Sequence, residues 1–343
     1  MSDEGVVYAR ADACEEHAED ASDRSLRNEM SQPVVETTIS LTTMPPETSA
    51  EASVAFIVGC SRSGTTWLQR MLAEHPAVYT GQESHVFEWF IGPMLRKWHR
   101  MVAVYEGYDP SRRNGIGLGA YLTTEEFRDL LRPLIHRAME PSGAGRGEVF
   151  LEKTPGHSMF VPEIVDMLPE ARFIHLVRDP RDVVASLLRA SKSWGQAWAP
   201  SSAKEAARQW LRHVSAVQRA KEELGKEQFF EIRYEDLHRA PAEVLSRLVG
   251  FLELEWAPSA IEESIKTNSP EKIRAGKATP LPVFGQLGKS VSLVRGEPSG
   301  FVGRARPGRG KDDLSLPQKL VVWRATRTLA REFGYEWSPK DFL

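Results

Sequence analysis

A short glycine-bearing loop between an apolar run and a helical pattern constrains this chain more than any other feature. Residues 54–58 (VAFIV) are uniformly apolar and stop at Gly59, as is typical of a strand buried on both faces. Residues 61–66 then read SRSGTT, and apolar residues follow at helical spacing from Trp67 to Leu72. A loop at such a junction directs backbone N–H groups and the positive end of the helix toward an anion. The pattern therefore predicts an anion-binding unit rather than a turn that only packs a helix on a sheet.

The spacing of Gly59 and Gly64 is that of a P-loop, but one residue of that motif is replaced. The position after Gly64, where a Walker A motif has lysine, is occupied by Thr65. The loop carries its cation at Arg62 instead. This difference counts against a P-loop kinase or related nucleotide phosphotransferase, which we keep as the alternative function.

The alternation of apolar runs and helical patterns recurs along the chain. Apolar runs at residues 149–151, 173–177 and 229–232 predict three further strands. Long helices are expected over residues 124–139, 203–224 and 317–333. Strands that alternate with helices indicate a parallel sheet covered by helices on both faces. We therefore expect an α/β, P-loop-like three-layer fold with a central parallel sheet flanked by helices.

Charge and composition divide the chain near residue 52. Residues 1–50 contain eleven Asp and Glu against three Lys and Arg, a balance of −8, whereas the whole chain carries −3, so the rest carries +5. The acidic stretch has few bulky apolar residues and cannot bury enough surface to offset the entropy of ordering. We predict a disordered acidic tail over residues 1–52 and one folded domain over 53–343. The basic excess of that domain suits an anionic ligand but is too small to indicate nucleic acid.

Cysteine usage and hydropathy bear on the location of the protein. The two cysteines, Cys14 and Cys60, lie in dissimilar surroundings, which fits a reducing compartment without disulfides. No run approaches the ~18 apolar residues that a membrane span needs. The first residues lack the basic head and apolar centre of a signal peptide. We expect a soluble, cytoplasmic protein without a membrane span, and the oligomeric state is left open.

Two segments resemble the family of sulfotransferases that use 3′-phosphoadenosine-5′-phosphosulfate (PAPS). The run from Arg62 to Trp67 (RSGTTW), after a buried strand, is similar to the 5′-phosphosulfate loop of that family. Residues 173–186 (FIHLVRDPRDVVAS) resemble its 3′-phosphate site, where a strand-end arginine and the serine eight residues later bind the phosphate. These two residues are Arg178 and Ser186 here. The resemblance implies that PAPS is the co-substrate, that it is released as 3′,5′-ADP, and that no metal takes part.

Two shorter segments resemble the same family in the same order. Residues 151–155 (LEKTP) resemble a second strand end, where a lysine, here Lys153, contacts the sulfuryl group. Residues 233–237 (RYEDL) resemble an element whose tyrosine, here Tyr234, lies near the adenine, and Trp67 matches the tryptophan that stacks on that base. The resemblance covers roughly residues 54–255 and makes 53–343 the sulfotransferase domain. The donor-binding residues that it implies are Arg62, Ser63, Gly64, Thr65, Thr66, Trp67, Arg178, Ser186 and Tyr234.

The stretch after the loop resembles the bacterial and protein-tyrosine branch of the superfamily. Residues 72–76 (LAEHP) and 81–85 (GQESH) carry this likeness. In that branch a glutamate shortly after the loop is the catalytic base, and Glu83 stands in the matching place, 21 residues beyond Arg62. The intervening helix, short strand and turn return the chain to the carboxyl edge of the sheet. The catalytic residues implied are Glu83, Arg62 and Lys153.

Other bases remain open at this point. The cytosolic branch uses a histidine two residues after the strand-end lysine, but Pro155 occupies that position and His157 follows it. His85 is a further candidate. Alternatively, Glu83 is only a structural partner of Arg62.

The resemblance implies in-line displacement at sulfur. The lack of a membrane-spanning run and of disulfides favours a small molecule or glycan as the acceptor, and a phenol, a sugar, a lipid alcohol and a peptidyl tyrosine all remain open. A nucleotide-binding module without catalysis is a further alternative, although it would not need both Glu83 and Lys153. The basic stretch 266–312 is expected to form loops over the nucleotide, but the sequence does not decide which of Arg304, Arg306, Arg309 and Lys311 takes part. Aromatic residues that line an acceptor pocket or belong to the core are Phe87, Trp89, Phe90, Trp98, Tyr105, Tyr108, Trp194 and Trp198.

Overall fold

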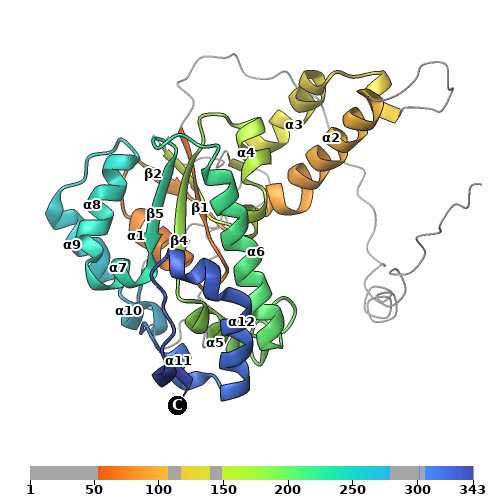
Figure 1. The fold of residues 1–343 in the computed structure, drawn as a ribbon. Helices are drawn as coiled ribbons and strands as arrows, with labels where there is room; N and C mark the ends of the chain where they lie inside the picture. Colours follow the sequence, from red (N-terminus) through yellow and green to blue (C-terminus); the bar gives the residue numbers. More distant parts are fainter. Residues whose placement is uncertain (1–52, 107–116, 140–148, 279–300, 302–305, 343) are drawn as a thin grey trace, which may run out of the picture. The chain divides into compact units, whose positions relative to one another are not determined.

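A parallel five-stranded sheet lies at the centre of the described part of the chain (Figure 1). The computed structural model describes residues 53–106, 117–139, 149–278, 301 and 306–342, so the acidic tail predicted for 1–52 lies outside the described residues. The strands are β1 (Ser53–Val58), β2 (Val78–Thr80), β3 (Val149–Glu152), β4 (Arg172–Val177) and β5 (Phe229–Arg233). Their spatial order is β2-β3-β1-β4-β5.

All neighbouring strands are paired in parallel, which confirms the predicted sheet. Phe56 of β1 pairs with Glu152 of β3 on one side and with Phe173 of β4 on the other. β4 also pairs with β5, up to Val177 opposite Arg233. Because all strands run in the same direction, their carboxyl ends meet at one edge of the sheet, where ligands of open α/β sheets bind.

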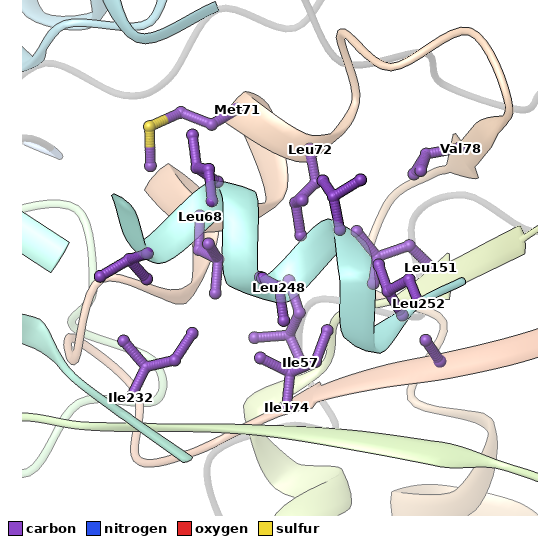
Figure 2. Close-up of a cluster of buried hydrophobic side chains, with 14 of the residues drawn as sticks. Ile57, Leu68, Met71, Leu72, Val78, Leu151, Ile174, Ile232, Leu248 and Leu252 are labelled. Carbon is purple, nitrogen blue, oxygen red and sulfur yellow. The ribbon is translucent and has the colours of Figure 1, made fainter. Parts of the chain in front are cut away.

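Successive residues of β1 face opposite layers, as the side-chain alternation of a strand requires. Ile57 lies in a buried cluster with Leu68 and Leu72 of α1 (Thr65–Leu72) and Leu248 of α8 (Pro241–Phe251), as Figure 2 shows. Phe56 packs on the other face, in a cluster that includes residues of α4 (Val161–Met167) and α6 (Ala203–Lys221). The sheet is therefore the middle of three layers.

The helices expected from the sequence are present with small shifts at their ends. The helix predicted at 124–139 is α3 (Thr124–Met139), the one at 203–224 ends earlier as α6, and the one at 317–333 is α12 (Leu316–Glu332). The remaining α-helices are α2 (Gly92–Glu106), α5 (Pro180–Ser191), α7 (Tyr234–Arg239), α9 (Pro258–Thr267), α10 (Pro270–Arg274) and α11 (Gly310–Asp313). Other helical turns are the π-helix η2 (Val86–Ile91) and the 3₁₀ turns η3 (Gly117–Ala120), η4 (Pro155–Met159) and η6 (Pro339–Phe342).

The basic stretch predicted as loop contains two short helices, α10 and α11, although 279–300 and 302–305 lie outside the described residues. Over the residues that the structure covers, no helix combines the length and the apolar character that crossing a membrane would demand.

Candidate active site

The loop between β1 and α1 has a backbone that requires glycine at two positions. Gly59 has φ +152°, and a Cβ there would lie 2.5 Å from the carbonyl oxygen of Leu176 on β4. Gly64 has φ +102° and abuts the ring of Tyr234. The first hydrogen bonds of α1 run from Trp67 N–H and Leu68 N–H to the carbonyl of Gly64. The N–H groups at the start of a helix have no partner within it, so they are available to an anion.

The guanidinium of Arg62 lies on the same side of the loop as Ser186. Its Nε donates to Ser186 Oγ at 3.2 Å, and its Nη2 donates to the carbonyl of Phe301. The rings of Trp194 and Phe301 flank it at 5.0 and 4.6 Å. Arg62 itself has φ +74°, an uncommon backbone conformation for a residue with a side chain. The sequence did not indicate this orientation or the role of Phe301.

Arg178 emerges at the end of β4, as predicted, and several groups fix its guanidinium. It lies over the ring of Tyr234 at 4.0 Å, and its Nη2 donates to Asp182 at 3.1 Å. Its Nη1 lies 3.4 Å from the carbonyl oxygen of Arg62. Arg178 and Arg62 therefore both contact α5, Arg178 at Asp182 in its first turn and Arg62 at Ser186 near its middle.

These residues line one pocket, and arginine dominates its charge. The loop contributes Arg62 and residues 64–67, and the second segment contributes Arg178 and Ser186. Tyr234 also lines it, and Trp67 packs edge-on against Tyr234. The lining includes six arginines against the two aspartates Asp182 and Asp313: Arg62, Arg70, Arg178, Arg189, Arg306 and Arg309. Such a pocket favours a ligand with more than one anionic group.

Ser63 and the basic C-terminal candidates differ in whether they reach the pocket. Ser63 is buried, and its N–H donates to the carbonyl of Cys60 rather than toward the pocket. Of the basic C-terminal candidates, Arg306 and Arg309 line the pocket, whereas Lys311 pairs with Asp341 at 2.6 Å. Arg304 lies outside the described residues.

Glu83 and Lys153 form an ion pair at the ends of β2 and β3. Lys153 is almost fully buried, and its ammonium donates to Glu83 Oε1. The Glu83 side chain is 37% exposed, so it remains open to a molecule from solvent. The two residues lie 70 positions apart in the sequence. The structure thus joins two of the three predicted catalytic residues, whereas the hydrogen bonds found for Arg62 run to Ser186 and Phe301.

His85 lies beside Glu83 but is engaged elsewhere. Its Nδ1 is 2.7 Å from Glu88 Oε2, and its Nε2 is 3.5 Å from Glu83 Oε2. The hydrogen bond with Glu88 raises the pKa of His85, and the same bond lowers the pKa of the Glu88 carboxyl. The imidazole also stacks on Trp89 at 3.9 Å. His85 is therefore suited to holding the segment after Glu83 in place.

His157, the other alternative base, is completely buried. Its Nε2 accepts the N–H of Phe87 at 3.2 Å, and its Nδ1 is 3.5 Å from Glu152. Burial acts to raise the pKa of Glu152, but His157 and the hydroxyls of Ser84 and Thr154 outweigh it and hold that pKa below its ordinary value. A ring enclosed in this way cannot meet a molecule from solvent, whereas Glu83 is partly exposed, and the assignment of the base stays a prediction.

Across the described residues, no three or more histidines, cysteines, aspartates or glutamates are grouped so that they could hold a metal ion. The metal-free reaction stays a prediction.

Replacing Gly64 with alanine tests the close approach of the loop to Tyr234. A Cβ at this position would lie 2.7 Å from the Tyr234 ring, on a backbone with φ +102°. We expect Gly64→Ala to lower the free energy of unfolding by about 1–3 kcal/mol, measured by urea denaturation. Gly250→Ala is the control, because nothing lies within 4 Å of a Cβ there. Equal stability of the two variants would contradict the described loop.

The model of the family described as "Sulfotransferase family" matches residues 55–258. A protein-tyrosine sulfotransferase of Drosophila melanogaster is 24% identical over 227 residues, which cover 66% of this chain and 43% of the relative. Protein-tyrosine sulfotransferase 1 of Danio rerio is 26% identical, covering 59% of this chain and 53% of the relative. The chain spans about half the length of these curated relatives.

Solved structures share the fold at low sequence identity. The sulfotransferase domain of the Synechococcus PCC 7002 olefin synthase has a TM-score of 0.50 at 20% identity, covering 85% of this chain and 98% of that one. Mouse sulfotransferase SULT7A1, solved in complex with PAP, also has a TM-score of 0.50, at 13% identity, covering 82% of this chain and 88% of that one. These likenesses confirm the predicted P-loop-like α/β fold.

Proposed function

Because the chain belongs to the sulfotransferase family, we propose that this enzyme transfers a sulfuryl group from PAPS to an acceptor hydroxyl or amine and releases 3′,5′-ADP. One observation supports this more than any other. A single arginine-rich pocket contains both the loop that follows β1 and the pair Arg178 and Ser186. PAPS carries anionic groups at both its 5′ and 3′ ends, and the two halves of the pocket match them.

The pocket residues divide between the parts of the donor. The N–H groups at the start of α1 bind the 5′-phosphosulfate, because a helix N-terminus favours an anion. Arg178 and Ser186 bind the 3′-phosphate, and Trp67 and Tyr234 contact the adenine. Arg62 donates to Ser186 in the structure, so we assign it first to donor binding and second to stabilising the charge on the departing phosphate.

Glu83 and Lys153 carry the transfer step. PAPS, when bound, supplies the electrophilic sulfur and a phosphate leaving group. Glu83 takes the proton of the acceptor as the acceptor oxygen or nitrogen bonds to sulfur, a role that contributes typically ~10²–10⁴-fold. The ammonium of Lys153 and the loop N–H groups stabilise the charge that develops on the bridging oxygen as its bond to sulfur breaks. The nearly buried Lys153 side chain is well placed for this, because electrostatic stabilisation is strongest where water is excluded.

The surroundings of Glu83 suit an acceptor with an apolar part. Trp89 and Phe90 on η2 are 62% and 53% exposed, and Trp89 stacks on His85 next to Glu83. A phenol or an amphiphilic alcohol fits these aromatic surfaces best. The matched relatives are named protein-tyrosine sulfotransferases, so the tyrosyl hydroxyl of a peptide is a second candidate acceptor. A glycan hydroxyl is a third.

Equilibrium binding distinguishes a sulfotransferase from the alternative kinase. We expect 3′,5′-ADP to bind the full chain more tightly than ATP with Mg²⁺, because Thr65 replaces the lysine that holds the β- and γ-phosphates. Tighter binding of ATP with Mg²⁺ would favour the phosphotransferase.

Arg178→Ala tests the 3′-phosphate assignment. The loss of a hydrogen bond to a charged group should make the free energy of binding 3′,5′-ADP less favourable by about 1.5–3 kcal/mol, measured by isothermal titration calorimetry. The affinity for 5′-AMP, which lacks the 3′-phosphate, should change far less. If both ligands lose the same affinity, Arg178 does not read the 3′-phosphate.

A further inference from the structure

Asp182 is a buried carboxylate that the reaction itself does not use. It lies in the first turn of α5, and its side chain is 1% exposed. Oδ1 accepts the N–H of Gly310 at 2.6 Å, and Oδ2 accepts the N–H of Gly308 at 2.9 Å. Oδ2 also accepts Nη2 of Arg178 at 3.1 Å. A buried charge is costly unless it is fully hydrogen-bonded, so these three bonds stabilise one defined arrangement.

The segment that Asp182 binds approaches α5 at the level of the backbone. A Cβ on Gly310 would lie 2.2 Å from the carbonyl carbon of Arg181, so only glycine permits this contact. The neighbouring Arg309 lines the pocket, and so does Arg306. The docking of this segment on α5 therefore decides where two pocket arginines lie.

Arg178 depends on the same carboxylate. Its guanidinium lies between the ring of Tyr234, at 4.0 Å, and Asp182. An arginine held by a carboxylate and a ring loses less side-chain entropy when it binds a phosphate than an unrestrained one does. A carboxylate facing the phosphate directly would repel it, so any favourable effect of Asp182 must act through the groups that it positions.

We propose that Asp182 is a positioning residue that assembles the 3′ side of the donor pocket, by fixing Arg178 and docking the backbone of residues 308–310 in one hydrogen-bonded unit. This inference rests on the proposed binding of PAPS in the pocket. It assigns to Asp182 a contribution to donor selectivity without any contact to the donor.

The test uses Asp182→Asn in the full chain. The amide keeps the size of the side chain, but its NH₂ group replaces one carboxylate oxygen. That group is a donor and cannot accept from Arg178 or from the N–H groups of Gly308 and Gly310. We expect the affinity for 3′,5′-ADP to fall roughly 10-fold or more, whereas the affinity for 5′-AMP falls less than about 3-fold. In turnover assays KM for PAPS should rise by a similar factor, with kcat at saturating PAPS within about 3-fold.

A second readout follows the docked segment directly. At least one of the amides of Gly308 and Gly310 should exchange with deuterium faster in Asp182→Asn than in the wild type, because the single amide oxygen cannot replace both carboxylate oxygens as acceptors. Should Asp182→Asn not fold, Gly310→Ala replaces it, since the added Cβ displaces the same segment while leaving Asp182 and Arg178 unchanged. It should show the same selective loss of 3′,5′-ADP affinity.

Asp166→Asn is the matched control. Asp166 pairs with Arg128 and His99, away from the pocket, so its loss should affect stability and leave the ratio of the two affinities unchanged. If Asp182→Asn leaves the ratio of the affinities for 3′,5′-ADP and 5′-AMP unchanged, whether both affinities fall equally or neither falls, the proposed role of Asp182 is overturned. A wild-type protein that does not prefer 3′,5′-ADP over 5′-AMP would instead overturn the proposed donor, so the two failures are distinguishable.

Discussion

Replacing Glu83 with glutamine should lower the turnover number by ~10²-fold or more while leaving PAPS affinity nearly unchanged. The amide has the size of the carboxylate and can still accept a hydrogen bond from Lys153, so the fold should persist. It cannot take the proton of the acceptor, so the chemical step loses its base. We propose Glu83 as the base rather than as a structural partner because it is partly exposed beside the buried Lys153.

The measurement for Glu83→Gln is a single-turnover rate with PAPS bound, together with calorimetric binding of 3′,5′-ADP. Glu163→Gln is the matched control, because Glu163 also forms an ion pair, with Arg96 at 2.5 Å, away from the proposed site. The control should keep its turnover. A Glu83→Gln enzyme that keeps most of its turnover would refute the assignment and direct attention to His85.

Lys153→Met should reduce turnover by roughly 10²–10³-fold, the range found when one donor to a developing negative charge is removed. Methionine fills a similar volume on the buried side, but it offers no charge to the bridging oxygen. Donor affinity should fall less than turnover does, because the interaction strengthens as charge develops. The substitution also leaves Glu83 without its ammonium partner.

Steady-state kcat and KM for PAPS test this expectation, with Lys221→Met as the control. Lys221 pairs with Glu231 at 3.2 Å, outside the pocket, so its loss should not change kcat. The double variant Glu83→Gln and Lys153→Met should lose far less than the product of the single effects, since groups that act as one unit are not additive. Fully multiplicative losses would show that the two residues act independently.

The strands and their motifs could be predicted from the sequence because the information is local. The apolar runs that stop at Gly59 and Arg178 have the period and length of buried strands, and parallel pairing brings their ends to one edge. The pairing of Glu83 with Lys153 depends in addition on β2 and β3 being neighbours in the sheet, which the structure shows and the sequence did not predict.

Other parts of the site depend on contacts between segments far apart in the chain. The bond between Asp182 and Gly310 spans 128 residues, and the bond between Arg62 and Phe301 spans 239. The basic stretch gave no local pattern that would place Arg309 in the pocket. The RDPRD segment does contain a signal for Asp182, because Arg178 and Asp182 carry opposite charges four residues apart. The partners of Asp182 in residues 308–310 are not visible from spacing.

The most direct test of the proposed function is group transfer by the wild-type protein. We expect label from [³⁵S]PAPS to appear on at least one acceptor of a panel containing a phenol, a long-chain alcohol, a hexose and a tyrosine-containing peptide. One 3′,5′-ADP should be released for each group transferred, and [γ-³²P]ATP with Mg²⁺ should give no labelled product. Transfer of phosphate from ATP to the same panel, with PAPS left unconsumed, would contradict the account.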